Sequence, residues 1–364
     1  MAVCARRLWC VADTGRVSTG ESASGVAAIG AAAEVGSTME LGTVISRWIG
    51  RVIPHEGYML AAVDPVTGVG CFLARDHGYS PAAARRLTLG DRLDGDHPFP
   101  FEQLVEGPCR VGVLNTDAPG LRRNAAMRAV MADQGVGSEL RVALVEAGTA
   151  WGGLVLLRPR GARPFSVAEA ALAQRLGRDV VTAMRRYATG APPEPSRLDQ
   201  PPGVLVFGAD ETVVAATPSA REWIGELETL PAHVLAAPHM PMESTIWNLT
   251  QAARRPDTPA LTRIPTRRGW IVLRAQPMTG EEKSAVAVTI QPATGTELLP
   301  AMALWHGLTP KERAVIDHVL EGQATKQIAR RLGMSPHTVN DHFKSIYRKI
   351  GVSAREELIA RFLG

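Results

Sequence analysis

The clearest hydrophobic pattern lies in residues 308–364. Apolar side chains recur there every three or four positions in four short runs, which is the spacing of helices with one buried face. In the first run, Thr309 and Glu312 can form a capping box, Pro310 suits the first helical turn, and Gly322 marks the end. The pattern therefore predicts four helices in this segment.

The second and third runs are joined by a short turn. The second helix is expected to begin at Thr325 as its capping residue and to end at Gly333; the third is expected to begin at Ser335, with Pro336 in its first turn. A fourth helix is expected from Ser353, with a capping box completed three residues later. Two helices joined by a tight glycine-containing turn form a helix-turn-helix, whose second helix enters the major groove of DNA.

Basic residues are concentrated in the same segment. Between Thr309 and Gly364 there are ten Lys or Arg residues and six Asp or Glu residues, an excess of four positive charges. This excess equals the net charge of the whole chain, +4, so the remaining residues are balanced. A basic segment that contains a helix-turn-helix indicates a polyanionic partner, here double-stranded DNA.

These residues also resemble a known family. The stretch LTPKERAVIDHVLEGQATKQIARRLGMSPHTVNDHFKSIYRKIGV is similar to the LuxR/FixJ-type DNA-binding domain. The similarity rests on the opening L-T-x-x-E, the K-x-I-A-x-x-L of the second helix, the S-x-x-T-V-x-x-H of the third and the closing R-K-x-G-V. The alternative is a three-helix module that binds protein instead of DNA.

The resemblance implies a role for seven residues. Asn340 and Lys344 would face base edges, because asparagine can pair with adenine and lysine can donate to guanine. Asp341 lies beside them and departs from the uncharged residue expected of the family; it could accept from cytosine N4 or repel a phosphate. The expected phosphate contacts, each of which could instead be part of a solvated helix face, are Lys326, Thr338, Arg348 and Lys349.

The resemblance also implies two structural roles in this domain. His342 matches a position that is usually packed inside it. The last helix, around 354–363, resembles the element through which the family dimerises on two half-sites.

Upstream, alternating patterns predict a first α+β domain at 39–188. A helix from Glu40 is stopped by Pro54 and a later helix opens with a capping box at Ser166, whereas residues 80–135 give no clear pattern. The expected strands are Tyr58–Asp64, Gly68–Arg75, Ser138–Ala147 and Trp151–Pro159. An antiparallel sheet flanked by helices in this order resembles a GAF domain.

A proline-rich stretch at 189–202 is expected to be a linker to a second α+β domain at 203–296. Helices are expected from Pro218 and over Thr245–Arg254. The expected strands are Gly203–Gly208, Thr212–Ala216, Ala260–Pro265, Trp270–Pro277 and Ala285–Pro292. This order resembles a PAS domain, and the all-α DNA-binding domain is expected at 303–364.

Composition fits a globular protein, with 45% hydrophobic and 21% charged residues. Residues 1–38 are mostly small and predict a disordered tail, and translation could start at Met39 instead of Met1. The apolar stretch near the N-terminus is too short for a secretion signal, and no run of eighteen apolar residues occurs. The chain is therefore expected in the cytoplasm, with no membrane contact.

Several other chemistries are disfavoured. Four cysteines without a close C-x-x-C pair, and scattered histidines, predict no metal site, and no cofactor is expected. No lysine follows a glycine, which excludes a phosphate-binding loop, and the lack of lysine before Lys283 argues against a phosphoacceptor receiver domain. We therefore expect no enzymatic activity.

The sequence predicts a transcription regulator that binds DNA as a homodimer. Its two upstream domains are expected to be sensory, with an unidentified small-molecule ligand, and RNA polymerase is an expected partner. Two alternatives remain at this stage. One is a redox switch or enzyme-like module centred on Cys71 or Cys109 and targeted to DNA. The other is a constitutive DNA-binding protein that recruits the transcription machinery.

Overall fold

A computed structural model describes residues 35–80, 99–116, 125–190, 200–210, 212–227, 241–255, 260–266, 269–279 and 285–363, with residues 30 and 83. Contacts divide the chain into two compact units. Residues 1–63, 68–187 and 228–248 make up the first, and residues 64–67, 188–227 and 249–364 the second. The predicted tail lies almost wholly outside the described residues. In the part that is described, no helix is both long and apolar enough to span a bilayer.

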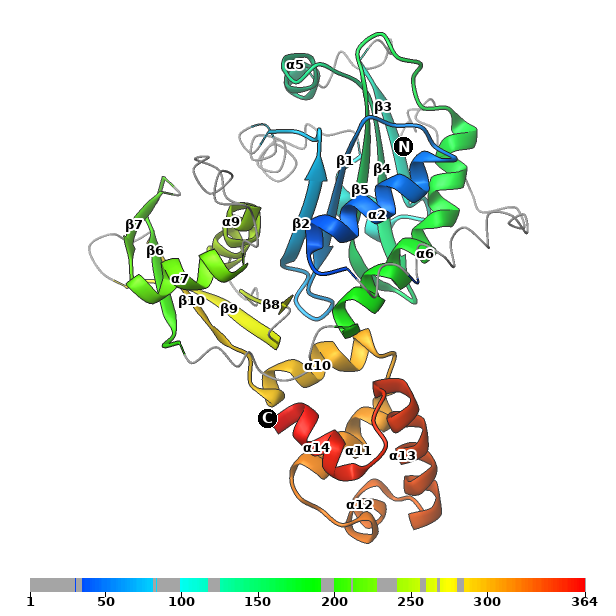
Figure 1. Ribbon diagram of the computed structural model, residues 1–364, viewed down its shortest axis with the longest axis vertical. Helices are drawn as coiled ribbons and strands as arrows, with labels where there is room; N and C mark the ends of the chain where they lie inside the picture. The colour runs from blue at the N-terminus through cyan, green and yellow to red at the C-terminus, as the bar shows by residue number, and fades with distance from the viewer. Residues whose placement is uncertain are drawn as a thin grey trace, which may run out of the picture. The chain divides into compact units, whose positions relative to one another are not determined.

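The first unit contains a five-stranded antiparallel sheet in the order β2-β1-β5-β4-β3 (Figure 1). Its strands are β1 (Gly57–Val63), β2 (Gly70–Asp76), β3 (Val111–Asn115), β4 (Val136–Glu146) and β5 (Thr149–Pro159). Its helices include α2 (Thr38–Gly50), α4 (Phe101–Glu106), α5 (Ala125–Asp133) and α6 (Val167–Gly190). The expected antiparallel α+β class is therefore confirmed.

Helices cover both faces of this sheet, because alternate residues of a strand point to opposite sides. On one face, Gly42 of α2 lies so close to Tyr58 and Ala74 that a Cβ would overlap both side chains. On the other face, Met59 and Phe101 of α4 pack against a buried apolar cluster. The sheet therefore lies between α2 on one face and α4 on the other.

Local turn chemistry fixes the β4–β5 hairpin. Ala147 and Gly148 both have positive φ, at 49° and 80°, and they join paired residues Glu146 and Thr149. Two consecutive left-handed residues make the tight turn that matches the twist of an antiparallel pair. After the hairpin, the Oγ of Ser166 accepts from the Glu169 N–H, and a Glu169 oxygen accepts from the Ser166 N–H at 2.8 Å, as the predicted capping box requires.

A second five-stranded antiparallel sheet has the order β7-β6-β10-β9-β8. When the five strands of each sheet are numbered in chain order, both sheets have the same spatial order, 2-1-5-4-3. The strands are β6 (Gly203–Phe207), β7 (Val213–Ala216), β8 (Leu261–Thr266), β9 (Gly269–Pro277) and β10 (Val286–Pro292). The intervening helices are α7 (Pro218–Leu227) and α9 (Pro241–Ala253).

The structure corrects several predicted boundaries. The helix α6 continues to Gly190, so the expected linker begins later than residue 189; residues 191–199 lie outside the described part. The helix α9 begins at Pro241, before Thr245. The unassigned region 80–135 contains α4, β3 and α5. The helix α10 (Gly295–Trp305) spans the gap between the expected second domain, which ends at 296, and the expected DNA-binding domain, which begins at 303.

Four helices close the chain, as the hydrophobic pattern predicts. They are α11 (Pro310–Leu320), α12 (Thr325–Leu332), α13 (Pro336–Ile350) and α14 (Arg355–Leu363). The capping residue of α12 is Ala324 instead of Thr325, and the Gln327 side chain accepts from its N–H at 2.8 Å. The expected capping box at Ser353 is also wrong, because the Ser353 N–H donates to Glu357 and the helix begins at Arg355.

Candidate nucleic-acid interface

The turn between α12 and α13 is set by two local signals. Gly333 ends α12 in the left-handed region with φ 65°, and the Met334 N–H donates to Ala329 O at 2.8 Å. Ser335 then caps α13, because its Oγ accepts from the Thr338 N–H at 3.0 Å. These signals fix where α13 starts and leave only a short connection to α12, which is the helix-turn-helix arrangement.

One face of α13 is buried and holds the helix against its neighbours. The buried residues of α13 are Val339, Phe343, Ile346 and Ile350. The helix α13 contacts α11 and α12, whose buried apolar residues include Val315, Ile316, Val319 and Ile328. Because the buried residues of α13 are three or four positions apart, they line one face of the helix and leave the opposite face in solvent, where a DNA groove could receive it.

A buried ion pair connects the two ends of the domain. The carboxylate of Glu312, only 4% exposed, accepts from Lys349 Nζ at 2.7 Å and from the Thr309 N–H at 2.7 Å. Burial alone would raise the pKa of Glu312, but the hydrogen bonds from Lys349 and from Thr309 outweigh it and lower the pKa to about 2. Lys349 therefore has an internal partner, which the sequence prediction of a phosphate contact did not include.

The other six predicted DNA-contacting residues are exposed. Lys326 lies on α12, and the others lie on α13: Thr338, Asn340, Asp341, Lys344 and Arg348. The Thr338 hydroxyl also hydrogen-bonds Ser335 Oγ at 2.9 Å, so it takes part in the cap. His342 is half-buried, in keeping with a packing role. The domain thus presents these six side chains to solvent on the two helices of the motif.

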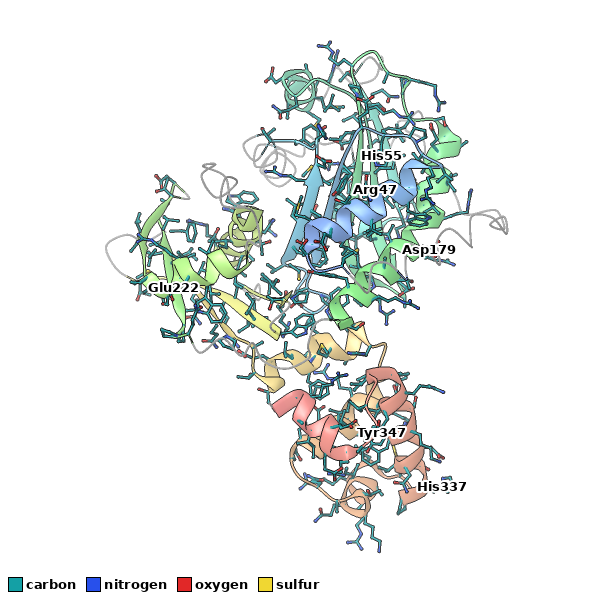
Figure 2. All side chains as sticks on the ribbon, in the orientation of Figure 1. Arg47, His55, Asp179, Glu222, His337 and Tyr347 are labelled. Atoms are coloured by element: carbon teal, nitrogen blue, oxygen red, sulfur yellow. The ribbon has the colours of Figure 1, made fainter. Side chains whose placement is uncertain are left out.

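Asp341 is held between two donors on the exposed face of α13. One carboxylate oxygen is 3.0 Å from Lys344 Nζ, and the other is 3.0 Å from His337 Nδ1. The hydrogen bond from Lys344, followed by the charges of Lys344 and His337, lowers the pKa of Asp341. Figure 2 shows His337 at the outer side of α13, pointing away from the other helices.

Three exposed residues of the motif were not singled out by the sequence prediction. Arg330 and Arg331 lie in the last turn of α12, and His337 lies in the first turn of α13. The spacing of His337, Asp341 and Lys344, four and then three residues apart, would have indicated one helix face. Arg330 and Arg331 could have been found from their charge alone.

The last helix packs inside the second unit. Leu358 and Phe362 of α14 are buried, and the carbonyl of Phe362 lies so close to Gly295 of α10 that a Cβ there would overlap it. At the other end of α10, His306 Nδ1 lies 2.9 Å from Lys349 O. The helix α10, which lies alongside α14 in Figure 1, is therefore attached to the DNA-binding helices at both of its ends.

The candidate redox and metal residues lie elsewhere. Cys71 is buried within β2 and Cys109 is half-buried, with its thiol 3.5 Å from Val111 O; within the described part of the chain, neither forms a disulfide. His55 contacts Ser46 Oγ and Ile53 O through its two ring nitrogens. Among the described residues, no three His, Cys, Asp or Glu side chains gather in a way that could hold a metal ion.

Comparison with known proteins places the C-terminal helices in a family. The model for bacterial regulatory proteins of the LuxR family matches residues 306–362. An HTH-type transcriptional regulator of Mycobacterium tuberculosis is 46% identical over 55 residues, which is 15% of this chain and 6% of that protein. The transcriptional regulatory protein UhpA of Escherichia coli is 33% identical over 114 residues, 29% of this chain and 56% of UhpA. The chain thus spans only a small part of the mycobacterial relative.

Solved structures resemble the chain only loosely. The N-acylhomoserine lactone dependent LuxR family factor CepR2 of Burkholderia cenocepacia has a TM-score of 0.32 and 14% identity, over 46% of this chain and 93% of CepR2. A phycoerythrobilin-bound GAF domain from a cyanobacterial phytochrome has a TM-score of 0.32 and 16% identity, over 47% of this chain and 97% of that domain. Similarities this weak do not identify a ligand.

About three quarters of a short relative is covered by this chain. The spore germination protein GerE of Bacillus subtilis is 34% identical over 56 residues, which is 15% of this chain and 76% of GerE. The aligned length is that of the helical domain, in which α13 has the exposed face and the cap of a recognition helix. The chain therefore belongs to the LuxR family of bacterial regulatory proteins, and α11–α14 are its helix-turn-helix DNA-binding domain.

Proposed function

We propose that the two sheet-containing parts of the chain are sensory and that they control DNA binding by α11–α14. The observation that carries this proposal is the position of α10. This helix follows β10 directly along the chain and contacts α14, and all of these elements belong to the second unit. A change in the second sheet can therefore reach the DNA-binding domain through one rigid element.

Contacts at its N-terminal end tie α10 to the second sheet. The guanidinium of Arg263 on β8 donates to Glu297 O in the first turn of α10. Arg274 on β9 donates to a Glu297 side-chain oxygen at 2.6 Å. Thr294 caps the helix in a capping box with the same Glu297. Because the helix end is held by both backbone and side chains, it is expected to follow movements of β8 and β9.

Contacts with α13 and α14 connect α10 to the DNA-binding helices. By family resemblance, α14 is the helix through which two domains pair on DNA. The close approach of Gly295 to the Phe362 carbonyl places α10 against this helix. We infer that docked α10 limits pairing, and that a signal in the sheet-containing parts releases it. A ligand that binds the released arrangement better would shift the population toward the DNA-binding homodimer.

The proposed partners follow from this mechanism. The homodimer would bind two half-sites of double-stranded DNA, a small molecule would bind one of the sheet-containing parts, and RNA polymerase would be contacted at the promoter. A protein that acts on bacterial chromosomal DNA works in the cytoplasm. The proposed mechanism uses no residue of the described part as a catalytic group.

Gly295→Ala tests control through α10. The added Cβ would overlap the Phe362 carbonyl, so α10 and α14 must separate. We expect the full-length variant to bind a duplex selected from a random library about tenfold more tightly than the wild type, because release no longer has to be supplied by a signal. Binding is measured by fluorescence anisotropy, and separation of α14 by faster amide hydrogen exchange.

Thr296→Ala is the matched control. Thr296 lies one residue further along α10 and is exposed, so the substitution removes atoms without adding any against α14. The Thr296→Ala variant should have the same DNA affinity and the same rate of amide hydrogen exchange in α14 as the wild type. If Gly295→Ala speeds exchange in α14 while DNA affinity stays unchanged, control through α10 is wrong.

A further inference from the structure

A charged strip runs along the exposed face of the recognition helix. It consists of His337, Asp341 and Lys344, whose side chains are 84%, 53% and 76% exposed. His337 and Lys344, at the two ends of the strip, are seven positions apart along the helix. This corresponds to a rise of about 10 Å, which is the length of about three base pairs. The strip is therefore long enough to face several successive bases in a major groove.

Each carboxylate oxygen of Asp341 already has one donor. One oxygen takes the Lys344 ammonium and the other takes His337 Nδ1, each at 3.0 Å. A second lone pair remains on each oxygen, so these contacts do not block a base; they fix the orientation of the carboxylate and of its two donors. A bare carboxylate facing DNA would also repel phosphates, whereas one flanked by two donors adds no net negative charge to the strip once Lys344 is counted.

The same contacts restrict the two donors. Lysine has four rotatable bonds and loses considerable freedom when it binds a base, so a partner that already holds it in place lowers that loss. For His337, the contact at Nδ1 restricts the ring and leaves Nε2 as the nitrogen that can bind DNA. Both side chains are thus arranged along the groove-facing side of α13 before DNA binds.

We propose that Asp341 is a positioning residue that holds Lys344 and His337 for base recognition, and that His337 is a further specificity-determining residue. This rests on the proposed binding of DNA by α13. Lys344 would donate to guanine acceptors, and His337 would contact the base nearest the start of the helix. Asp341 itself contacts no base, and its effect on specificity is exerted through its two neighbours.

Asp341→Asn separates this role from the alternatives. The change is nearly isosteric, and the pairs it removes are exposed, so the domain should stay folded. For the full chain, we expect affinity for a random-sequence duplex to rise a few fold, because a negative charge is lost. Preference for the duplex selected by the wild type over the random duplex should fall about tenfold.

A double-mutant cycle provides the second measurement. His337→Ala alone should lower the preference for the selected duplex, and combining it with Asp341→Asn should cost less than the sum of the two, because the residues act as a unit. The same non-additivity is expected with Lys344→Ala. Glu356→Gln, an exposed acidic residue of α14, is the matched control for a change in net charge alone.

The other outcomes overturn the proposal in different ways. If Asp341→Asn leaves the preference ratio unchanged, the strip is a solvated helix face. If repeated selection with this variant changes the preferred base at a single position and the cycles are additive, Asp341 reads a base directly. If the wild-type chain itself does not prefer any selected duplex over the random one, the proposed DNA recognition fails before this proposal is reached.

Discussion

Glu312→Gln is expected to lower the free energy of unfolding of the C-terminal domain by about 3 kcal/mol at pH 7. The estimate follows from a pKa that is lowered from 4.5 to about 2 in the folded chain. The carboxylate is 4% exposed and faces the Lys349 ammonium at 2.7 Å, so a neutral amide leaves that ammonium without its charged partner. Amide hydrogen exchange of α11 and α13 in the full chain measures the loss.

The same ion pair predicts how the domain responds to acid. Because the folded pKa of Glu312 lies below its unfolded value, the stabilisation is fully present above about pH 5 and is lost as the pH falls toward 2. Wild-type α11 and α13 should therefore lose protection over this range, whereas Glu312→Gln should be less protected at neutral pH and change less on acidification. The measurement is hydrogen exchange at a series of pH values, corrected for the intrinsic exchange rate.

Glu321→Gln is the control for this prediction. Glu321 lies just after α11, its side chain is 54% exposed, and it pairs with His318 and Arg331 on the surface. Its loss should change stability by no more than about 0.5 kcal/mol. Equal losses for the two variants would show that Glu312 gains nothing from its hydrogen bonds with Lys349 and Thr309.

The sequence predicts best where structure is decided by neighbours along the chain. The capping boxes at Thr309 and Ser166 and the cap at Ser335 are formed by residues three positions apart, so the helix starts were placed correctly. Alternation also revealed the β4–β5 hairpin, whose turn is local. The helix α10 carries the same kind of signal, a Thr294–Glu297 capping box, and could have been found from it.

Features that depend on distant residues could not be read in this way. The partner of Lys349 is Glu312, which is 37 positions away, so the sequence alone could not distinguish a phosphate contact from an internal ion pair. Likewise, the shared strand order of the two sheets depends on which edges pair after the chain has folded. The capping residue of α12 was predicted wrongly because Ala324, which occupies this position, has no side chain that can accept a hydrogen bond. The Gln327 side chain instead accepts from the Ala324 N–H.

Lys344→Ala is expected to reduce the preference of the full chain for its selected duplex about 10- to 100-fold. A lysine that donates to guanine O6 and N7 contributes about 1 to 3 kcal/mol of discrimination, and its loss should affect the random duplex much less. The side chain is 76% exposed and packs against no core residue named above, so a stability change is not expected to contribute. Competition binding at fixed salt, with both duplexes, measures the ratio.

Lys326→Ala is the matched control, because Lys326 is also exposed but lies at the start of α12, the helix that crosses the backbone in this arrangement. If Lys326 contacts a phosphate, its loss should weaken binding to both duplexes alike. It should also reduce the slope of log K against log salt concentration by about one unit. Lys344→Ala should show the opposite pattern, with a large change in the ratio and a small change for the random duplex. Equal weakening of both duplexes by Lys344→Ala would assign Lys344 to the phosphates and leave base reading to Asn340 and His337.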